Sequence, residues 1–348
     1  MKAIVLNGPN DFSLHEVENP IPGDDDVEIR VRMAGICGTD VHLLRGRNPF
    51  ARYPVVPGHE YMGEVLTAPK KSKLKKGERV TVYPATGCGK CEACEAGRLP
   101  HCPEFTFIGV RLPGGCFAER VVADYRKVFP LPEDIDDEVG AMVEPTAVAV
   151  HANRRADIRG GERVVVIGGG TIGLLIAQAA MAYGASKVIL SEPIAERRGV
   201  ASEVGLELLC DPQREDLVSF TKRNVRMAEV VFDVVGTEKT LIDAEYMLRS
   251  DGRLVLIALP HSEGQGVPYR DIFAKELKVI GSRTYFMEDF PEAIELLRTE
   301  KVHARPLVSK VLPLHRFAEG VDLLEREPEQ YVKILINPLM SKATTSLG

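Results

Sequence analysis

Four cysteines crowd one short stretch of this chain, and their spacing suits a metal ion. The stretch CGKCEACEAGRLPHC begins at residue 88 and leaves two, two and seven residues between Cys88, Cys91, Cys94 and Cys102. Four thiolates on a compact loop can surround zinc as a tetrahedron with Zn–S bonds of about 2.3 Å. Such a complete shell has no position for water or substrate, so the pattern predicts a structural zinc. An iron–sulfur cluster and free thiols stay as alternatives.

A second group of candidate ligands is spread over three motifs. Cys37 lies in AGICGTDVH, His59 and Glu60 lie in PGHEYMG, and Glu144 lies in MVEPTAVAVHA. Taken singly, each of these residues has a simpler interpretation. A lone cysteine is most often a small buried hydrophobic residue, and a His-Glu pair most often lies on the surface. A carboxylate at the start of a helix most often interacts with the helix N-terminus. Together, a thiolate, an imidazole and a carboxylate are the set that holds a catalytic zinc with one position open. The sequence leaves open whether Glu60 or Glu144 is the ligand.

A glycine-rich turn predicts a dinucleotide site. Gly168, Gly170 and Gly173 form G-x-G-x-x-G in GGGTIG, directly after RVVVI and at the start of TIGLLIAQAA. The glycines permit a tight turn and close backbone approach. The pyrophosphate would then lie at the helix N-terminus, beside Thr171 and Ile172.

The residue at the end of the next strand bears on the choice of cofactor. Glu192, in VILSEP, can accept both hydroxyls of the adenosine ribose and would repel a 2′-phosphate, which favours NAD. Arg197 and Arg198 follow closely and could pair with a phosphate instead, so NADP stays the alternative. The simplest interpretation of these two arginines is a solvated helix face.

The pattern of apolar, proline and glycine residues along the chain indicates which secondary-structure elements contain these motifs. The first 150 residues contain short β segments with frequent proline and glycine. From about residue 160, apolar strands alternate with helices, which predicts a parallel, doubly wound sheet. We therefore expect a first domain over 1–150 with both metal motifs, a nucleotide-binding domain over 151–285, and a C-terminal segment over 286–348.

The order of the motifs resembles the zinc-dependent medium-chain alcohol dehydrogenase family. The resemblance is strongest to its sorbitol, polyol and sugar-acid branch, which includes L-idonate, L-galactonate and L-gulonate 5-dehydrogenases. It is carried by GICGTD, GHE with Gly63, the cysteine stretch, EP at residue 144 and GGGTIG, and it spans essentially the whole chain. It implies an α/β fold: a GroES-like β-barrel catalytic domain with both zincs, a Rossmann domain with a doubly wound parallel sheet, and a C-terminal return to the first domain.

The resemblance also implies roles for single residues. Thr39 matches the hydroxyl that starts the proton relay, and His42 is a candidate later member. The positions that match the structural zinc are the four cysteines of the stretch. The positions that match the catalytic zinc and its surroundings are Cys37, His59, Glu60 and Glu144. The expected cofactors are two zinc ions per chain and NAD.

The resemblance implies hydride transfer between NAD and a secondary alcohol of a polyol or sugar acid. A threonine-type or simple-alcohol dehydrogenase of the same family is the alternative. Arg111, in IGVRLPGG, and Arg283, in IGSRTYF, are candidates to hold a substrate carboxylate. Both could equally be surface residues or cofactor contacts. A zinc-binding interaction module would not explain the glycine turn, and a zinc-free quinone reductase would lack the metal ligands.

Composition argues against several other classes. The formal net charge of −6 and the absence of a basic stripe exclude a nucleic acid or an anionic membrane as partner. The uncharged run 164–183 has transmembrane length, but three consecutive glycines break it. Seven cysteines without a signal peptide indicate a cytoplasmic protein rather than a disulfide framework. By analogy with the family we expect a homo-oligomer, a dimer or a tetramer.

Overall fold

The computed structural model describes residues 1–48, 51–258 and 269–340. The chain divides into two compact units, and each is described by itself. Unit 1 comprises Met1–Glu144, Phe286–Arg298 and Val308–Gly348, and unit 2 comprises Pro145–Tyr285 and Thr299–Leu307.

Two details of this division differ from the segments expected from the sequence. The first division falls between Glu144 and Pro145, inside the helix α4 (Val143–Ala156), rather than after residue 150. The segment Thr299–Leu307, expected in the C-terminal return, belongs to unit 2. The reason is local bonding, because the backbone N–H of His303 donates to Gln178 Oε1 at 2.7 Å.

Unit 1 is built around a seven-stranded sheet. Its strand order is β16-β17-β3-β4-β5-β9, and β8 pairs with β3. Buried residues recur at every second position of β3, since alternate side chains of a strand point to opposite faces. The sheet strands are β3 (Asp26–Gly35), β4 (Glu60–Thr67), β5 (Arg79–Val82), β8 (Arg120–Asp124), β9 (Val128–Pro130), β16 (Val308–Pro313) and β17 (Lys333–Asn337).

Short elements complete unit 1. The remaining strands are β1 (Lys2–Gly8), β2 (Asp11–Glu16), β6 (Ala85–Thr86) and β7 (Thr106–Phe107). The α-helices are α1 (Gly38–Leu44), α2 (Glu92–Glu95), α3 (Asp137–Gly140), the start of α4, α10 (Phe290–Arg298) and α11 (Phe317–Arg326). Single 3₁₀ turns occur across both units at Lys70–Ser72, Leu99–His101, Tyr125–Lys127, Met287–Asp289, Arg305–Leu307 and Leu314–Arg316.

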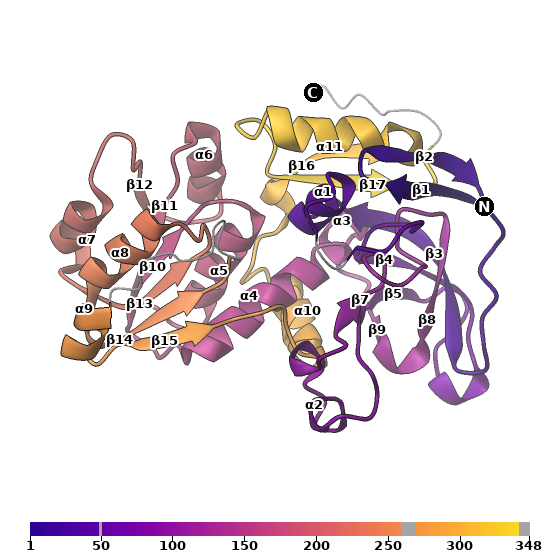
Figure 1. Cartoon of the computed structure of the whole chain (residues 1–348), viewed down its shortest axis with the longest axis horizontal. Coiled ribbons are helices and arrows are strands. Elements are labelled where there is room, and N and C mark those ends of the chain that lie inside the picture. Colours follow the sequence, from indigo (N-terminus) through magenta and orange to yellow (C-terminus); the bar gives the residue numbers. More distant parts are fainter. Residues whose placement is uncertain (49–50, 259–268, 341–348) are drawn as a thin grey trace. The chain divides into compact units, whose positions relative to one another are not determined.

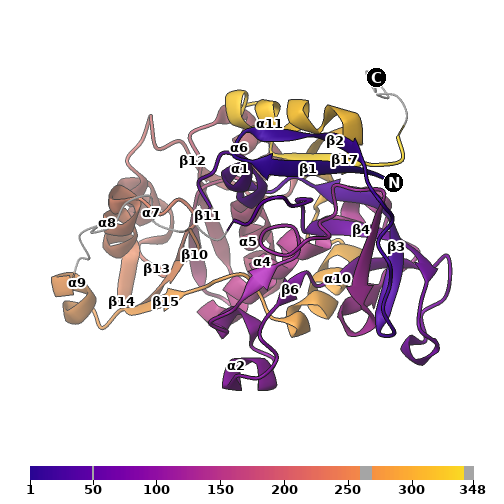
Figure 2. The same ribbon diagram turned by 45° about the vertical axis from the view of Figure 1, so that its right-hand side comes forward.

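The C-terminal elements of unit 1 lie beside its N-terminal strands. Figures 1 and 2 both show β17 and α11, in yellow, next to β1 and β2, in indigo. Aromatic side chains make this contact, with the ring centroids of Phe12 on β2 and Phe317 on α11 5.9 Å apart. In the sheet, β17 pairs antiparallel with β3, with Leu335 opposite Gly35. This pairing places the last strand next to the segment that carries Cys37.

Unit 2 confirms the predicted parallel, doubly wound sheet. All neighbouring strands in the order β12-β11-β10-β13-β14-β15 are parallel. The central strand β13 is buried throughout, as expected when helices cover both faces of a sheet. The strands are β10 (Arg163–Ile167), β11 (Lys187–Ser191), β12 (Leu208–Cys210), β13 (Ala228–Asp233), β14 (Leu248–Leu256) and β15 (Lys278–Gly281). The helices are the rest of α4, α5 (Thr171–Ala182), α6 (Ala195–Glu203), α7 (Leu217–Val225), α8 (Glu238–Met247) and α9 (Tyr269–Ala274).

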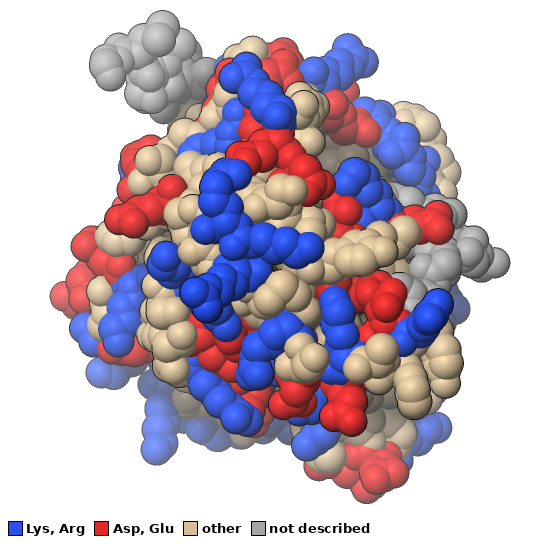
Figure 3. All heavy atoms as spheres, turned by 90° about the vertical axis from the view of Figure 1, so that its left-hand side faces the viewer, with Lys and Arg blue, Asp and Glu red and all other residues tan. Residues whose placement is uncertain are grey.

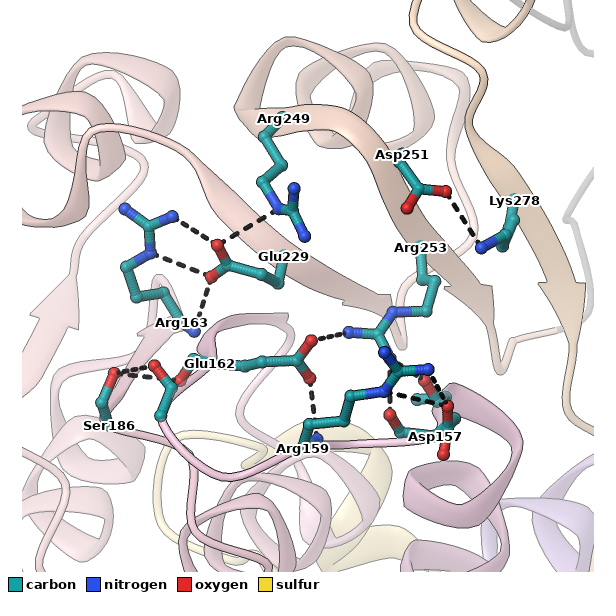
Figure 4. A network of polar contacts seen from close by, with 12 residues as sticks. Asp157, Arg159, Glu162, Arg163, Ser186, Glu229, Arg249, Asp251, Arg253 and Lys278 are labelled. Carbon is teal, nitrogen blue, oxygen red and sulfur yellow. Dashed lines mark hydrogen bonds and ion pairs between the residues drawn. The ribbon is translucent and has the colours of Figure 1, made fainter.

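Ion pairs connect residues near the amino ends of the central strands of unit 2 to one another (Figure 4). Glu229 Oε2 accepts hydrogen bonds from the backbone N–H (2.8 Å) and Nε (2.9 Å) of Arg163 on the neighbouring strand. Arg249 Nε lies 3.2 Å from Glu229 Oε1. Arg253 pairs with Glu162 and donates to the carbonyl oxygen of Ala156 at 2.7 Å. The network lies at the opposite end of β10 from the glycine turn, so it stabilises the sheet and leaves the carboxyl ends for ligand binding.

Figure 3 shows lysine and arginine side chains intermixed with aspartate and glutamate on one face of the molecule. This view shows no extended surface of one sign. Among the residues that the structure describes, no helix has the length and apolarity needed to span a bilayer. The uncharged run 164–183 is divided instead between β10, the glycine turn and α5.

Candidate metal and nucleotide sites

The four cysteines of the 88–102 stretch come together in unit 1. One ligand atom from each lies within 4.8 Å of all the others. The backbone N–H groups of Cys88 and Glu104 both donate to Cys102 Sγ at 3.3 Å. These bonds, the one from Cys88 foremost, lower the pKa of Cys102 to about 7. Because thiolates rather than thiols bind metals, the cluster fits a zinc ion with four sulfur ligands.

A second cluster joins the ends of two neighbouring strands. Cys37 follows β3 and is the N-cap of α1, while His59 and Glu60 stand at the start of β4. The β3–β4 register places Gly35 opposite Glu60, so the three candidate ligands approach within 4.8 Å of one another. His59 and Glu60 are buried. The thiol, imidazole and carboxylate form a donor set that fits zinc with one position left open.

Asp40 connects the two ligand segments, and the sequence analysis missed it. Its Oδ2 accepts a hydrogen bond from the backbone N–H of Cys37 at 2.9 Å, and its Oδ1 lies 3.7 Å from His59 Nδ1. Metal-binding histidines usually direct their second ring nitrogen to a carboxylate or carbonyl, which leaves Nε2 of His59 for the metal. The signal was present in GICGTD, because an aspartate three residues after a helix N-cap often bonds back to it.

The protonation of this cluster follows from its burial. Burial raises the pKa of the Cys37 thiol, and Glu60 raises it further against the opposing effect of His59. Burial alone would lower the pKa of His59, but Asp40 and Cys37 bring it well above its usual value. The metal-free site therefore retains protons, and a zinc ion would displace them on binding.

Two further charged residues are buried beside the cluster. Lys333, at the start of β17, pairs with Glu60 Oε2 and donates to the carbonyl oxygen of Ile36 at 3.0 Å. Glu144, 4% exposed, is close enough to contribute to the raised pKa values of His59 and Lys333. The sequence analysis missed Lys333, although a lone lysine in the apolar stretch YVKILIN was a visible signal.

Thr39 and His42 both lie on α1, directly after Cys37. They are three residues apart, which places them one turn apart on the same side of the helix. Thr39 is half-buried and His42 is exposed. The helix α1 therefore has two groups that can exchange protons, a half-buried one close in sequence to Cys37 and an exposed one a turn later.

The glycine turn of unit 2 has the geometry of a phosphate-binding turn. Gly168 has φ 104°, and a Cβ on Gly173 would lie 1.8 Å from the carbonyl oxygen of Gly168. Gly170 is the N-cap of α5, so the backbone of Thr171 and Ile172 forms the first turn of that helix. The N–H groups of the first turn of an α-helix point toward its N-terminal end, where a pyrophosphate can bind.

Glu192 is bonded to this turn. Its Oε2 accepts the backbone N–H of Gly169 at 2.7 Å, and its Oε1 accepts that of Ile194 at 2.9 Å. Arg198 is held within the protein, because it donates to the carbonyl oxygen of Glu192 at 2.7 Å and pairs with Asp211 at 3.0 Å. Arg197 lies beside the turn instead, with Nη1 3.9 Å from the position that a Cβ on Gly170 would take.

The two arginines proposed as substrate ligands belong to different units. Arg111 is half-buried in unit 1 and follows β7. Arg283 is exposed in unit 2 and follows β15. Their role toward a substrate stays a prediction.

Comparisons with known proteins show which families the chain is similar to. Residues 23–133 match the alcohol dehydrogenase GroES-like domain, and residues 171–299 match the zinc-binding dehydrogenase family. The chain is 34% identical to L-galactonate-5-dehydrogenase of Escherichia coli K12 over 322 residues, which covers 92% of this chain and 94% of the relative. It is 28% identical to sorbitol dehydrogenase of Bacillus subtilis over 344 residues, 97% of each chain.

Two solved structures with the same fold contain nicotinamide cofactors. A protein described as a short chain alcohol dehydrogenase from Escherichia coli CFT073, complexed with NADH, superposes with a TM-score of 0.89 at 29% identity. A protein described as a zinc-binding dehydrogenase from Sinorhizobium meliloti 1021, bound to NADP, superposes with a TM-score of 0.89 at 32% identity. Each comparison covers 97% of this chain and 99% of the other.

Proposed function

The chain belongs to the zinc-dependent alcohol dehydrogenase family, and on that premise we propose that its substrate is a polyol or a sugar acid. It is a zinc-dependent dehydrogenase that transfers a hydride between an alcohol and a nicotinamide dinucleotide. The observation that supports the substrate class is the buried Glu144 beside Cys37, His59 and Glu60, because a site with two carboxylates suits a polar substrate better than an apolar one. The names of the L-galactonate and sorbitol dehydrogenases among the relatives point the same way.

In this proposal the two cysteine-containing clusters hold two different zinc ions. Cys88, Cys91, Cys94 and Cys102 hold a structural zinc with a complete sulfur shell. The other cluster holds a catalytic zinc through Cys37, His59 and a carboxylate, with one position open for the substrate oxygen.

The chain's own residues bind the substrate and move its proton. When bound, the catalytic zinc would lower the pKa of the substrate hydroxyl, and the nicotinamide would take up the hydride. Thr39 Oγ accepts the hydroxyl proton as it gives up its own, and the relay would continue by a ribose hydroxyl of the bound cofactor to His42, which is exposed on α1 and releases a proton to solvent. His59 keeps its position because its Nδ1 faces the buried carboxylate of Asp40.

The proposed cofactor is NAD, bound at the glycine turn of unit 2. The carboxylate of Glu192 is fixed beside that turn by two backbone N–H groups and would oppose a 2′-phosphate on the adenosine ribose. Arg197, also beside the turn, is the residue that would accommodate NADP instead.

For a sugar-acid substrate, we propose that Arg111 or Arg283 binds the carboxylate. Removing a charged hydrogen bond worth roughly 1.5–3 kcal/mol should raise KM for a hexonate about 10–100-fold in Arg111→Ala or Arg283→Ala. The matching neutral polyol should change much less. Equal losses for the acid and the polyol would reject this role.

The substrate class is tested by following NAD reduction with polyols, aldonates and simple alcohols. We expect turnover of at least one polyol or hexonate that exceeds turnover of ethanol and benzyl alcohol. Activity on the simple alcohols with none on polyols or aldonates would overturn the proposal and favour a simple-alcohol dehydrogenase. Preferred oxidation of threonine would favour a threonine-type enzyme.

We propose a cytoplasmic homo-oligomer. Four cysteines that are free of disulfides and lie close enough to hold a metal suit a reducing compartment. The edge strand β15 of unit 2 has exposed residues, and Tyr269 and Phe273 of the preceding helix α9 are each 76% exposed. An exposed sheet edge and exposed aromatic side chains suit pairing with a second copy, and light scattering would give the mass of the assembly. A monomer would reject this part of the proposal.

A further inference from the structure

The ion pair between Glu60 and Lys333 joins residues from opposite ends of unit 1 inside the metal cluster. Both side chains are nearly inaccessible, at 2% and 3% exposure. The ammonium of Lys333 pairs with Glu60 Oε2 and donates to the carbonyl oxygen of Ile36 at 3.0 Å. Ile36 directly precedes the candidate ligand Cys37, so Lys333 contacts the segments that carry two candidate ligands.

The space for this pair depends on Gly35. A Cβ at that position would lie 2.3 Å from Glu60 Oε2 and 2.8 Å from Lys333 Cε. Gly35 is not among the glycines with positive φ, so its backbone conformation is open to other residues. The glycine is needed because β3 pairs there with β4 on one side and β17 on the other, and the ion pair occupies the side-chain space.

The pair limits what Glu60 can offer a metal. With Oε2 held by Lys333, the carboxylate has Oε1 left for coordination and cannot bind zinc through both oxygens.

We propose that Lys333 is a positioning residue of the catalytic zinc site, which rests on the proposed function above. It holds Glu60 Oε2, prevents that carboxylate from binding zinc through both oxygens, and so keeps the open position of the metal free for the substrate oxygen. The C-terminal strand β17 is thereby part of the metal site, although none of its residues is a ligand.

A purely structural role of Lys333 is the competing explanation, because a buried ion pair also links β17 to the neighbouring strands β3 and β4. Removing one partner of a buried pair is strongly destabilising in general, so loss of stability alone would not separate the two roles. The coordination number of the metal does separate them. A purely structural pair leaves the coordination number unchanged, whereas release of Glu60 Oε2 lets the carboxylate bind through both oxygens and raises the coordination number.

The test uses Lys333→Met with cobalt in place of the catalytic zinc. The visible spectrum reports coordination number, since four-coordinate cobalt absorbs far more strongly than five-coordinate cobalt. We expect a weaker, five-coordinate spectrum, at least about tenfold slower metal release to a chelator, and at least about tenfold lower kcat. Adding Glu60→Gln to Lys333→Met should restore the four-coordinate spectrum, because the amide is a poorer ligand.

Gly35→Ala is the second variant, and it carries the test if Lys333→Met does not fold. It keeps both charges but pushes Glu60 away from Lys333, so it should give the same spectral change. Lys310→Met is the matched control. Lys310 lies on β16, the strand next to β17, and its Nζ is 3.8 Å from Glu319 Oε1 on α11. It contacts no candidate ligand in the part of the chain that is described. It should leave spectrum, release rate and kcat unchanged.

The outcomes distinguish this inference from its premise. A wild type that binds a single zinc, at the four-cysteine cluster, overturns the proposed function and this inference with it. A wild type with two zincs, together with a wild-type cobalt spectrum and release rate in Lys333→Met or Gly35→Ala, overturns the inference alone.

Discussion

Asp40 Oδ1 lies 3.7 Å from His59 Nδ1, and both side chains are buried in unit 1. Neither atom has a hydrogen-bond partner among the described residues, so each is available for a hydrogen bond with the other. A small approach of the two groups on metal binding would form the hydrogen bond that fixes the imidazole. This relationship explains why a carboxylate that is not a candidate ligand lies at the centre of the cluster.

Asp40→Asn should weaken the catalytic metal site without unfolding unit 1. The amide oxygen can still accept the N–H of Cys37, but the charge that orients His59 is lost. We expect about 10–100-fold lower zinc affinity at this site, the usual effect of removing such a partner, measured by competition with a chelator. Asp322→Asn, at a half-buried aspartate that pairs with Arg45, is the control. Equal zinc affinity in Asp40→Asn and wild type would contradict the assigned role.

The two metal clusters should respond differently to loss of one cysteine. Cys91→Ser should lose one zinc and several kcal/mol of stability, because a structural zinc contributes directly to folding. Cys37→Ser should abolish turnover and leave a folded protein that binds the cofactor. Zinc analysis, thermal unfolding and NADH binding measure these outcomes. The assignment fails if Cys91→Ser keeps both metals or Cys37→Ser keeps full activity.

Glu192→Gln should shift cofactor preference toward NADP. The substitution removes the negative charge that opposes a 2′-phosphate, while the remaining amide oxygen can still accept one of the two backbone N–H groups. The readout is the ratio of kcat/KM for NAD and NADP, expected to fall about tenfold or more, which corresponds to about 1.4 kcal/mol. Glu196→Gln, on the exposed side of α6, should leave the ratio unchanged. A wild type that already prefers NADP would refute the interpretation of this carboxylate.

The buried Glu245 on α8 should make stability depend on pH. Burial, together with the neighbouring Asp271, raises the pKa of Glu245 to about 7, while Lys275 acts in the opposite direction. An acid with a raised pKa stays protonated in the folded state after it has ionised in the unfolded state. Its contribution to stability is therefore complete below the unfolded pKa of about 4.5 and is lost as the pH rises through about 7.

Urea denaturation at pH 5 and pH 8 measures this effect. We expect wild type to lose about 1–3 kcal/mol more than Glu245→Gln between these two values. Glu238→Gln, an exposed position on the same helix, should behave as wild type. The same loss in wild type and Glu245→Gln would show that Glu245 ionises normally.

Motifs that are local in the chain could be interpreted from the sequence. The four cysteines lie within one loop, and the glycine turn joins a strand directly to the helix that follows it. In such cases the spacing along the chain nearly determines the spacing in space, because few backbone angles separate the residues. The alternation of apolar strands with helices likewise predicted the parallel sheet of unit 2, since strands covered on both faces must be apolar throughout.

Contacts between distant segments depended on the tertiary structure. Cys37 and His59 could be paired by family resemblance, but Asp40 between them was missed, and Lys333 lies 273 residues from Glu60. The register of β3 with β4 and with β17 brings Gly35, Glu60 and Lys333 together, and a shift of one residue would turn each side chain to the other face. The sequence by itself determined which chemical groups are present and which of them neighbour one another along the chain. Only the folded sheet decided which buried charges lie together. A charge removed from water needs an opposite charge nearby, and the strand register determines which residue supplies it.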